Sequence, residues 1–217
     1  MNGSAQRLPL TIWVGFGLVF ILLGLMYLLS LVEYGRAKRQ ALPVLGQVAD
    51  FTLTNQAGAV TTLADLSNRV WVADIIFTRC AGSCPIMSTE MKSLQEALPS
   101  TSQAELVTLT TDPDYDTPAI LKRYGERYSA NFGRWTFLTG AKSELSGLAA
   151  GSLKLGSTPV APQDRQNADD LFVHSTIFVI VDKQARLRAI FQTEGQDVDW
   201  AKVKLQILAT IKELEGG

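Results

Sequence analysis

The sequence has 217 residues, of which 47% are hydrophobic and 19% are charged, a balance that excludes a largely disordered or low-complexity chain. Lys and Arg number 20 against 21 Asp and Glu, and beyond residue 40 the counts are 16 and 20, so the main part of the chain lacks the basic character of a nucleic-acid-binding protein. Two cysteines and one histidine exclude a disulfide-rich scaffold and a histidine-rich metal site.

The first predicted element is an apolar segment at residues 11–32, which follows a short N-terminal tail at residues 1–10. No charged residue occurs between Arg7 and Glu33. As a helix the segment is long enough to span a hydrocarbon core of roughly 30 Å, so it predicts a transmembrane anchor. A cleaved signal peptide is the alternative, but it has a shorter apolar region and a small-residue cleavage site, which the charged stretch after the segment does not offer.

The charges that flank this segment bear on its orientation. Arg7 stands alone before it, whereas Arg36, Lys38 and Arg39 follow it, and the positive-inside rule therefore places the rest of the chain in the cytoplasm. The chemistry discussed below favours the opposite orientation, in a bacterial inner membrane with the remaining chain in the periplasm. The N-terminus is not an Arg- and Ser-rich presequence, which favours a bacterial over an organellar membrane.

Residues 33–47 form a predicted linker, in which Pro43 and Gly46 act as breakers, and residues 48–217 form one predicted domain. Apolar periodicity predicts its elements in chain order: a hairpin of 51–53 and 60–63, a buried central strand at 70–77, a helix that opens at Pro85, a strand at 106–109, a helix from Thr117, a strand at 135–138, a helix at 143–150, a hairpin of 177–181 and 187–191, and a helix at 200–214. The predicted buried side of the helix from Thr117 consists of Ile120, Leu121, Tyr124 and Tyr128. Strands that alternate with helices indicate an α/β fold with a central sheet flanked by helices.

Two cysteines, Cys80 and Cys84, lie between the central strand and the following helix, where open α/β sheets place their sites. The helix N-terminus and Arg79 are expected to stabilise a thiolate at Cys84. The spacing brings the two sulfurs within reach of one soft ion or of each other. A structural disulfide is the alternative, but closing so short a loop stabilises by only about 2 kcal/mol, which favours functional thiols.

His174 is the single histidine and stands just before a predicted strand. A lone histidine is most often a structural residue. If the cysteine pair binds a metal ion, however, its imidazole is the one available as a third ligand, and low-coordinate, thiolate-rich sites favour Cu(I). The spacing alone leaves both interpretations open.

Several motifs, in the same order along the chain, resemble those of the SCO/SenC family of membrane-tethered copper-delivery proteins. These motifs are Asp50–Leu53, Phe77–Cys80, the Cys80 to Cys84 pair with Pro85, Thr111–Pro113, Asp116–Pro118, Phe137–Gly140 and His174–Ser175. The resemblance implies a thioredoxin-like fold over roughly residues 48–215. It implies that the residues matching Cys80, Cys84 and His174 bind copper, either as Cu(I) or as Cu(II). It also implies delivery to the copper-receiving subunit of cytochrome c oxidase, with other copper chaperones or thiol reductants as further partners, on the periplasmic side of the membrane.

The sequence departs from the family pattern at two positions. Val173 replaces the Asp that usually precedes the histidine, and Ala81 replaces a common Pro after the first cysteine. A carboxylate often orients a ligating imidazole, and Asp169 and Asp170 are candidates to replace it.

Asp74 lies within the predicted central strand, six residues before Cys80, the offset at which thioredoxins keep a buried acid. Such an acid is costly to bury unless it is paired or neutral. It is either a proton acceptor for Cys84 or a strand-end carboxylate paired with a basic residue, and the sequence leaves both interpretations open.

Two functions therefore compete. The first is a copper metallochaperone, and the second is an enzyme, a membrane-tethered thiol–disulfide oxidoreductase that reduces the cysteines of the acceptor copper site. In the second, Cys80 attacks and Cys84 resolves. His174 discriminates between them, because a copper site uses an imidazole whereas dithiol exchange does not.

Overall fold

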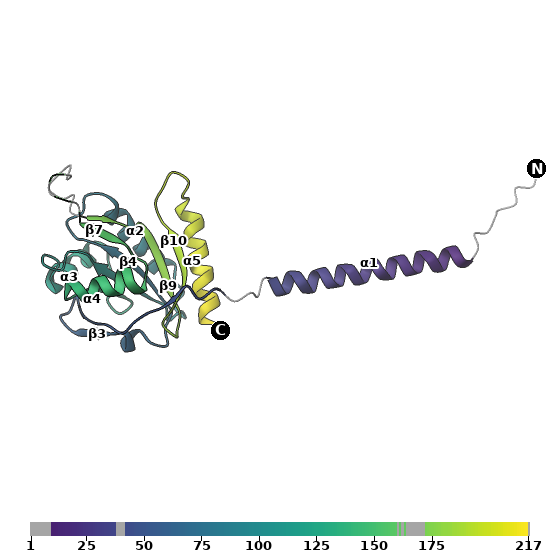
Figure 1. Cartoon of the computed structure of the whole chain (residues 1–217), viewed down its shortest axis with the longest axis horizontal. Helices are drawn as coiled ribbons and strands as arrows, with labels where there is room; N and C mark the ends of the chain where they lie inside the picture. Colours follow the sequence, from purple (N-terminus) through teal and green to yellow (C-terminus); the bar gives the residue numbers. More distant parts are fainter. Residues whose placement is uncertain (1–9, 38–41, 160, 162, 164–171, 217) are drawn as a thin grey trace, which may run out of the picture. The chain divides into compact units, whose positions relative to one another are not determined.

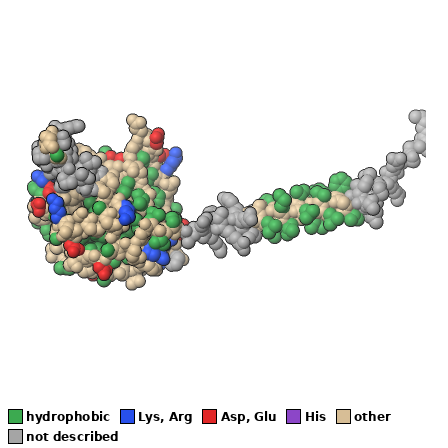
Figure 2. Space-filling model, viewed as in Figure 1, with side chains coloured by type: hydrophobic (Ala, Val, Ile, Leu, Met, Phe, Trp, Pro, Cys, Tyr) green, Lys and Arg blue, Asp and Glu red, His purple; other side chains and the backbone are tan. Residues whose placement is uncertain are grey.

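The computed structural model describes residues 10–37, 42–159, 161, 163 and 172–216. The chain divides into two compact units, Met1–Leu42 and Pro43–Gly217. The first contains α1 (Leu10–Ala37), in which the window Trp13–Ser30 has a mean hydropathy of 2.2 and none of its residues is buried within the protein. The described side chains of α1 are predominantly hydrophobic (Figure 2). By length and composition, this helix is sufficient to cross a membrane.

The second unit is built on an eight-stranded sheet in the order β1-β10-β9-β4-β5-β6-β2-β3, beside a two-stranded sheet of β7 and β8 (Figure 1). The strands are β1 (Gly46–Gln47), β2 (Thr52–Asn55), β3 (Val60–Thr62), β4 (Trp71–Ile76), β5 (Glu105–Thr110), β6 (Trp135–Thr139), β7 (Ser157–Pro159), β8 (Phe172–His174), β9 (Ile177–Val181) and β10 (Arg186–Gln192).

Three parallel strands, β4, β5 and β6, lie at the centre of the sheet, and β4 also pairs antiparallel with β9. Every residue of β4 and β5 is buried. The nearly continuous apolar run of β4 is typical of a strand covered on both faces, which explains why the sequence predicts the segment at 70–77 as central. The loops that follow β4 and β5 leave the sheet at the same edge, because the two strands are parallel.

Helices cover both faces of this sheet. On one face the core contains side chains from α2 (Ser83–Ala97), α3 (Pro118–Arg127) and α5 (Trp200–Glu215). On the other face it contains side chains from the short 3₁₀-helix η1 (Leu63–Leu66), from α4 (Lys142–Ser146) and from η2 (Gly147–Ser152). The predicted α/β architecture, with an N-terminal hairpin of β2 and β3, is confirmed.

Two local predictions need correction. The helix expected at 143–150 is α4 followed by η2, a π-helical turn, so the last part of the segment departs from α-helical geometry. The periodicity of α3 also predicted Ile120 on the buried side, but Leu121 and Tyr124 are buried while Ile120 is partly exposed and lines a surface groove. Register along a helix of ten residues is poorly fixed by apolar spacing when the buried stripe is this narrow.

Candidate metal and thiol site

Cys80 and Cys84 lie together at the carboxyl end of β4. Cys80 is in a tight turn, in which its backbone N–H donates to the Phe77 carbonyl oxygen at 3.1 Å. Cys84 lies in the first turn of α2, whose N-cap is Gly82. No disulfide joins the two cysteines, and a hydrogen bond links their side chains. The loop therefore brings together the two sulfurs that the sequence predicted as a functional pair.

The two thiols differ sharply in environment. Cys80 is half-buried, whereas Cys84 is fully buried in the core formed by α2, α3 and α5. Burial raises the pKa of the Cys84 thiol well above its ordinary value, and the Cys80 hydrogen bond raises it further, while the Phe77 backbone N–H, 3.5 Å from Cys84 Sγ, acts against this rise. This burial acts against the thiolate that the helix N-terminus is expected to stabilise at Cys84.

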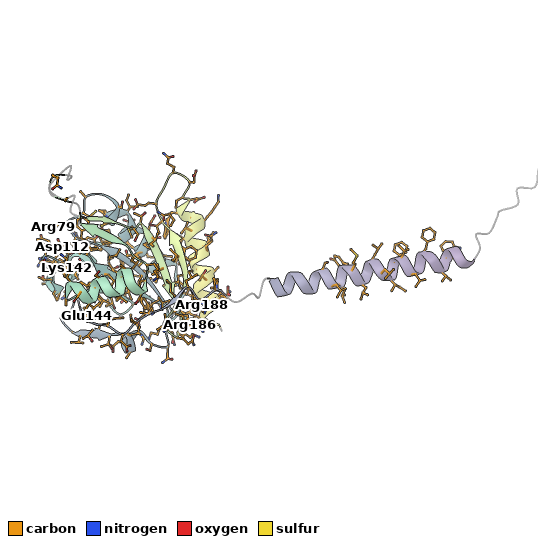
Figure 3. The ribbon with its side chains drawn as sticks, in the orientation of Figure 1. Arg79, Asp112, Lys142, Glu144, Arg186 and Arg188 are labelled. Carbon is orange, nitrogen blue, oxygen red and sulfur yellow. The ribbon has the colours of Figure 1, made fainter. Side chains whose placement is uncertain are left out.

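Arg79 also does not serve Cys84 as expected. Its guanidinium forms an ion pair with Asp112 at 2.5 Å and lies over the Tyr115 ring, with its Cζ atom 4.1 Å from the ring centroid (Figure 3). The hydrogen bond to Asp112 raises the pKa of Arg79, so its charge is held at this position. The positive charge of Arg79 therefore lies at the surface beside the cysteine loop and is paired with Asp112 rather than with the buried sulfur of Cys84.

Asp74 occupies the interior of β4 and is fully buried. It lies opposite Thr108 of β5 in the strand register. Its negative charge is one of the causes that raise the pKa of Cys84, which places the carboxylate near the buried thiol. The position is that of a group able to exchange a proton with Cys84, and this role remains a proposal.

His174 is the last residue of β8, and its backbone pairs with Ser157 of β7. The next residue, Ser175, donates its backbone N–H to the Gly156 carbonyl oxygen at 2.9 Å, which fixes the segment that follows the histidine. The side chains of Val173 and His174 lie outside the described residues, as do Asp169 and Asp170 entirely. Among the side chains that the structure does describe, no three of His, Cys, Asp and Glu form a group that could hold a metal ion.

The sequence analysis missed a buried carboxylate that supports the cysteine loop. Asp116 is fully buried and accepts hydrogen bonds from the Thr78 backbone N–H at 3.1 Å, from the Thr78 hydroxyl and from the Thr110 hydroxyl at 2.5 Å. Burial raises the pKa of Asp116, and these hydrogen bonds oppose the rise. The available signal was the position of Asp116 in a turn directly after a buried strand.

The comparisons with known proteins concern the family and the fold of the chain. The family model described as SCO1/SenC matches residues 41–209. A SCO1 protein homolog of Bacillus subtilis strain 168 is 33% identical over 141 residues, which are 64% of this chain and 70% of the relative.

Two solved structures show the same fold. BsSco, described as a member of the Sco family of cytochrome c oxidase assembly proteins with a disulfide switch, has a TM-score of 0.63 and 26% identity, and the match covers 81% of this chain and 98% of BsSco. ScoI of Bradyrhizobium japonicum, solved with copper bound, has a TM-score of 0.63 and 20% identity, over 77% of this chain and 99% of ScoI. The fold is therefore thioredoxin-like, as the resemblance implied. Because the family model spans well over half of the sequence, the chain belongs to the SCO1/SenC family.

Proposed function

We propose that this protein is a membrane-anchored copper metallochaperone that binds copper through Cys80, Cys84 and His174 and delivers it to the copper centre of cytochrome c oxidase during assembly. One observation carries the proposal: two hydrogen-bonded thiols, not joined by a disulfide, follow β4 in a chain of the SCO1/SenC family. Two sulfur donors, one half-buried and one buried, suit Cu(I), a soft ion that accepts low coordination numbers.

Copper binding is coupled to the loss of protons from the two cysteine thiols. Cysteine binds copper as thiolate, so each bound sulfur loses its proton to a base or to water. Because burial holds Cys84 in its protonated form, copper must displace that proton, and we propose that Asp74 accepts it and passes it to solvent. Copper affinity is then expected to increase with pH.

His174 is proposed as the third ligand. The backbone of β8 and the Ser175 hydrogen bond to Gly156 hold the histidine in an ordered two-stranded sheet rather than in an open loop. Two thiolates suffice for Cu(I), whereas Cu(II) prefers nitrogen or oxygen donors in tetragonal geometry. Loss of the imidazole should therefore weaken Cu(II) binding more steeply than Cu(I) binding.

The proposed location follows from α1 and from the chemistry. We propose that α1 anchors the protein in a bacterial inner membrane and that residues 43–217 face the periplasm, where the copper centre of the oxidase is assembled. The copper-receiving subunit is the proposed acceptor, and other copper chaperones or thiol reductants are the proposed donors of copper and of electrons.

A second candidate function is a tethered thiol–disulfide oxidoreductase. The observation that favours it is the difference between the half-buried Cys80 and the fully buried Cys84, with Asp74 near the latter. An exposed attacking thiol and a protected resolving thiol are what dithiol exchange requires. The same reduced pair binds copper, so the two activities are compatible.

A competitive titration of the full-length protein in detergent with Cu(I) and with Cu(II) tests the leading proposal. The wild type is compared with Cys80→Ser, Cys84→Ser and His174→Ala, and with Ser83→Ala as a matched control within the loop. We expect either cysteine variant to lose tight binding of both ions, His174→Ala to lose mainly Cu(II), and the control to match the wild type. Unchanged Cu(II) affinity in His174→Ala would remove the imidazole from the site and favour the oxidoreductase.

A further inference from the structure

A groove beside the cysteine loop is lined by arginine and aromatic side chains. It encloses about 710 Å³ and is lined by Thr78, Arg79, Tyr115, Ile120, Arg123, Tyr124, Glu126 and Arg127. Thr78 and Arg79 immediately precede Cys80, so the groove begins where the half-buried thiol is presented. The neighbouring position of Arg79 and Asp112 is visible in Figure 3.

The far wall of the groove is one face of α3. Ile120, Arg123, Tyr124 and Arg127 recur at helical spacing and project to the same side. Arg123 and Arg127 are exposed and four residues apart, an arrangement in which two like charges repel each other along the helix. Neither has an ion-pair partner among the residues that the structure describes. Such a pair slightly destabilises the helix, and an anion bound between the two guanidinium groups would offset this repulsion.

Two of the three guanidinium groups are held in place by aromatic rings. Arg79 lies 4.1 Å from the centroid of the Tyr115 ring, and Arg127 lies 4.9 Å from that of Tyr124. Stacking on a ring occupies the flat face of a guanidinium and leaves N–H groups on its edge for carboxylate oxygens. The groove therefore offers oriented donors rather than mobile charges.

The charge of the groove also contrasts with its surroundings. Three arginines, of which Arg79 is paired with Asp112, and one glutamate line it, whereas beyond residue 40 the chain carries 16 basic and 20 acidic residues. An acidic partner is repelled by most of this unit and attracted at the groove, which orients its approach. Two exposed apolar side chains flank the cysteine loop. Tyr115 is 42% exposed, and Ile86, which lies two residues after Cys84, is 50% exposed. Aromatic and arginine side chains are enriched at protein interfaces.

We propose that this groove is a docking surface for an acidic segment of the protein partner whose thiols or copper site meets Cys80. The identity of that partner rests on the proposed function. The preference of the groove for a peptide that bears carboxylates does not depend on copper binding. Docking at Arg79, Arg123 and Arg127 places the bound segment next to the half-buried Cys80.

Fluorescence anisotropy with two labelled peptides of equal length, one rich in Glu and one with Gln at the same positions, tests this surface. The full-length protein in neutral lipid nanodiscs is used as wild type and as the Arg123→Glu/Arg127→Glu double variant. Lys122→Glu is the single-reversal control and Lys122→Glu/Lys202→Glu is the double-reversal control, because both lysines are exposed and neither lines the groove.

We expect the wild type to bind the Glu peptide, to bind the Gln peptide at least about tenfold more weakly, and to lose affinity as salt increases. The groove variant should lose at least about tenfold in affinity for the Glu peptide, while both controls match the wild type. No binding by the wild type, or an equal loss in the double-reversal control, would overturn the proposal. Complete displacement by millimolar inorganic phosphate at constant ionic strength would also overturn it and indicate a small-anion site.

A second measurement separates this proposal from the proposed function. The Cu(I) affinity of the groove variant should equal that of the wild type, because neither substituted residue lies in the cysteine loop. If the wild type binds no copper but prefers the Glu peptide, the docking surface stands and the copper proposal fails. A groove variant that loses copper affinity together with peptide affinity would show a disrupted fold and overturn the assignment of these residues to docking alone.

Discussion

Asp116 accepts hydrogen bonds from both the backbone N–H and the hydroxyl of Thr78, although the two residues are 38 positions apart. Thr78 lies two residues before Cys80 in the loop after β4, and Asp116 lies in the loop after β5. One buried carboxylate thus joins the two loops at the carboxyl edge of the sheet. We expect the position of Cys80 to depend on this connection, because Thr78 lies only two residues before it in the same loop.

Replacing Asp116 should therefore affect both stability and copper binding. Asp116→Asn keeps the size of the side chain but replaces one acceptor oxygen with a donor, and we expect a loss of about 2 kcal/mol in the free energy of unfolding, together with weaker Cu(I) binding. Urea denaturation and Cu(I) competition measure the two effects. Asp114→Asn is the control, since Asp114 is exposed in the same turn and should change stability by less than about 0.5 kcal/mol.

The different burial of the two cysteines predicts an order of alkylation. Iodoacetamide should modify Cys80 in the folded protein more than about tenfold faster than Cys84, because burial both shields Cys84 and keeps it protonated. Mass spectrometry of Cys84→Ser and Cys80→Ser under native conditions measures each rate separately. Both should react readily in denaturant, and a native Cys84 as reactive as Cys80 would contradict the buried position.

The sequence was sufficient for the order of the elements, because the buried strand β4 and the amphipathic helices carry strong apolar patterns. It was also sufficient to pair Cys80 with Cys84, since a short loop limits how far apart the sulfurs can lie. It was not sufficient for the protonation of Cys84, which depends on how deeply α2 packs against other elements. Nor could it assign Asp112 to Arg79, because that contact joins two loops far apart in the chain.

Orientation in the membrane can be tested by a fusion. Alkaline phosphatase, which is active in the periplasm, placed after Gly217 should be active if the C-terminal unit faces that compartment. A cytoplasmic reporter at the same position should be inactive. The opposite pair of results would follow the positive-inside count of Arg36, Lys38 and Arg39 and would contradict the proposed location.

Val173 provides a test specific to this chain, since the family usually has Asp there. A carboxylate beside a ligating imidazole orients the ring and increases its basicity, so Val173→Asp should tighten Cu(II) binding by up to about tenfold. Val173→Asn is the matched control, with a similar shape and no charge. Cu(II) competition and the copper–thiolate absorption band measure the effect, and an equal gain in both variants would exclude an electrostatic cause.

The last prediction concerns Glu90, a residue of α2 that is 7% exposed. Its Oε2 atom is buried and has no hydrogen-bond partner among the residues that the structure describes. Burial raises the pKa of Glu90 to about 7, and the charges of Glu194 and Asp74 add to the rise, while a hydrogen bond with Thr193 opposes it. The Thr193 hydroxyl also donates to the Thr176 carbonyl oxygen at 3.0 Å, so Thr193 lies between Glu90 and the segment that follows His174.

The sign of the pH dependence follows from this raised pKa. Between the ordinary value of 4.5 and about 7, the folded protein keeps a proton on Glu90 that the unfolded chain releases, so stability falls as pH increases through this window. Glu90→Gln cannot ionise and should remove the fall. We expect this variant to match the wild type near pH 4.5 and to exceed it near pH 8 by up to about 3 kcal/mol in the free energy of unfolding.

Urea denaturation of residues 43–217 across this pH range measures the difference. Glu96→Gln is the control, because Glu96 lies on the same helix, is exposed and forms only a long contact of 3.9 Å with Lys92. It should keep the pH slope of the wild type. If Glu90→Gln keeps that slope as well, Glu90 does not hold its proton in the folded protein, and the loss of stability toward alkaline pH must come from another buried group.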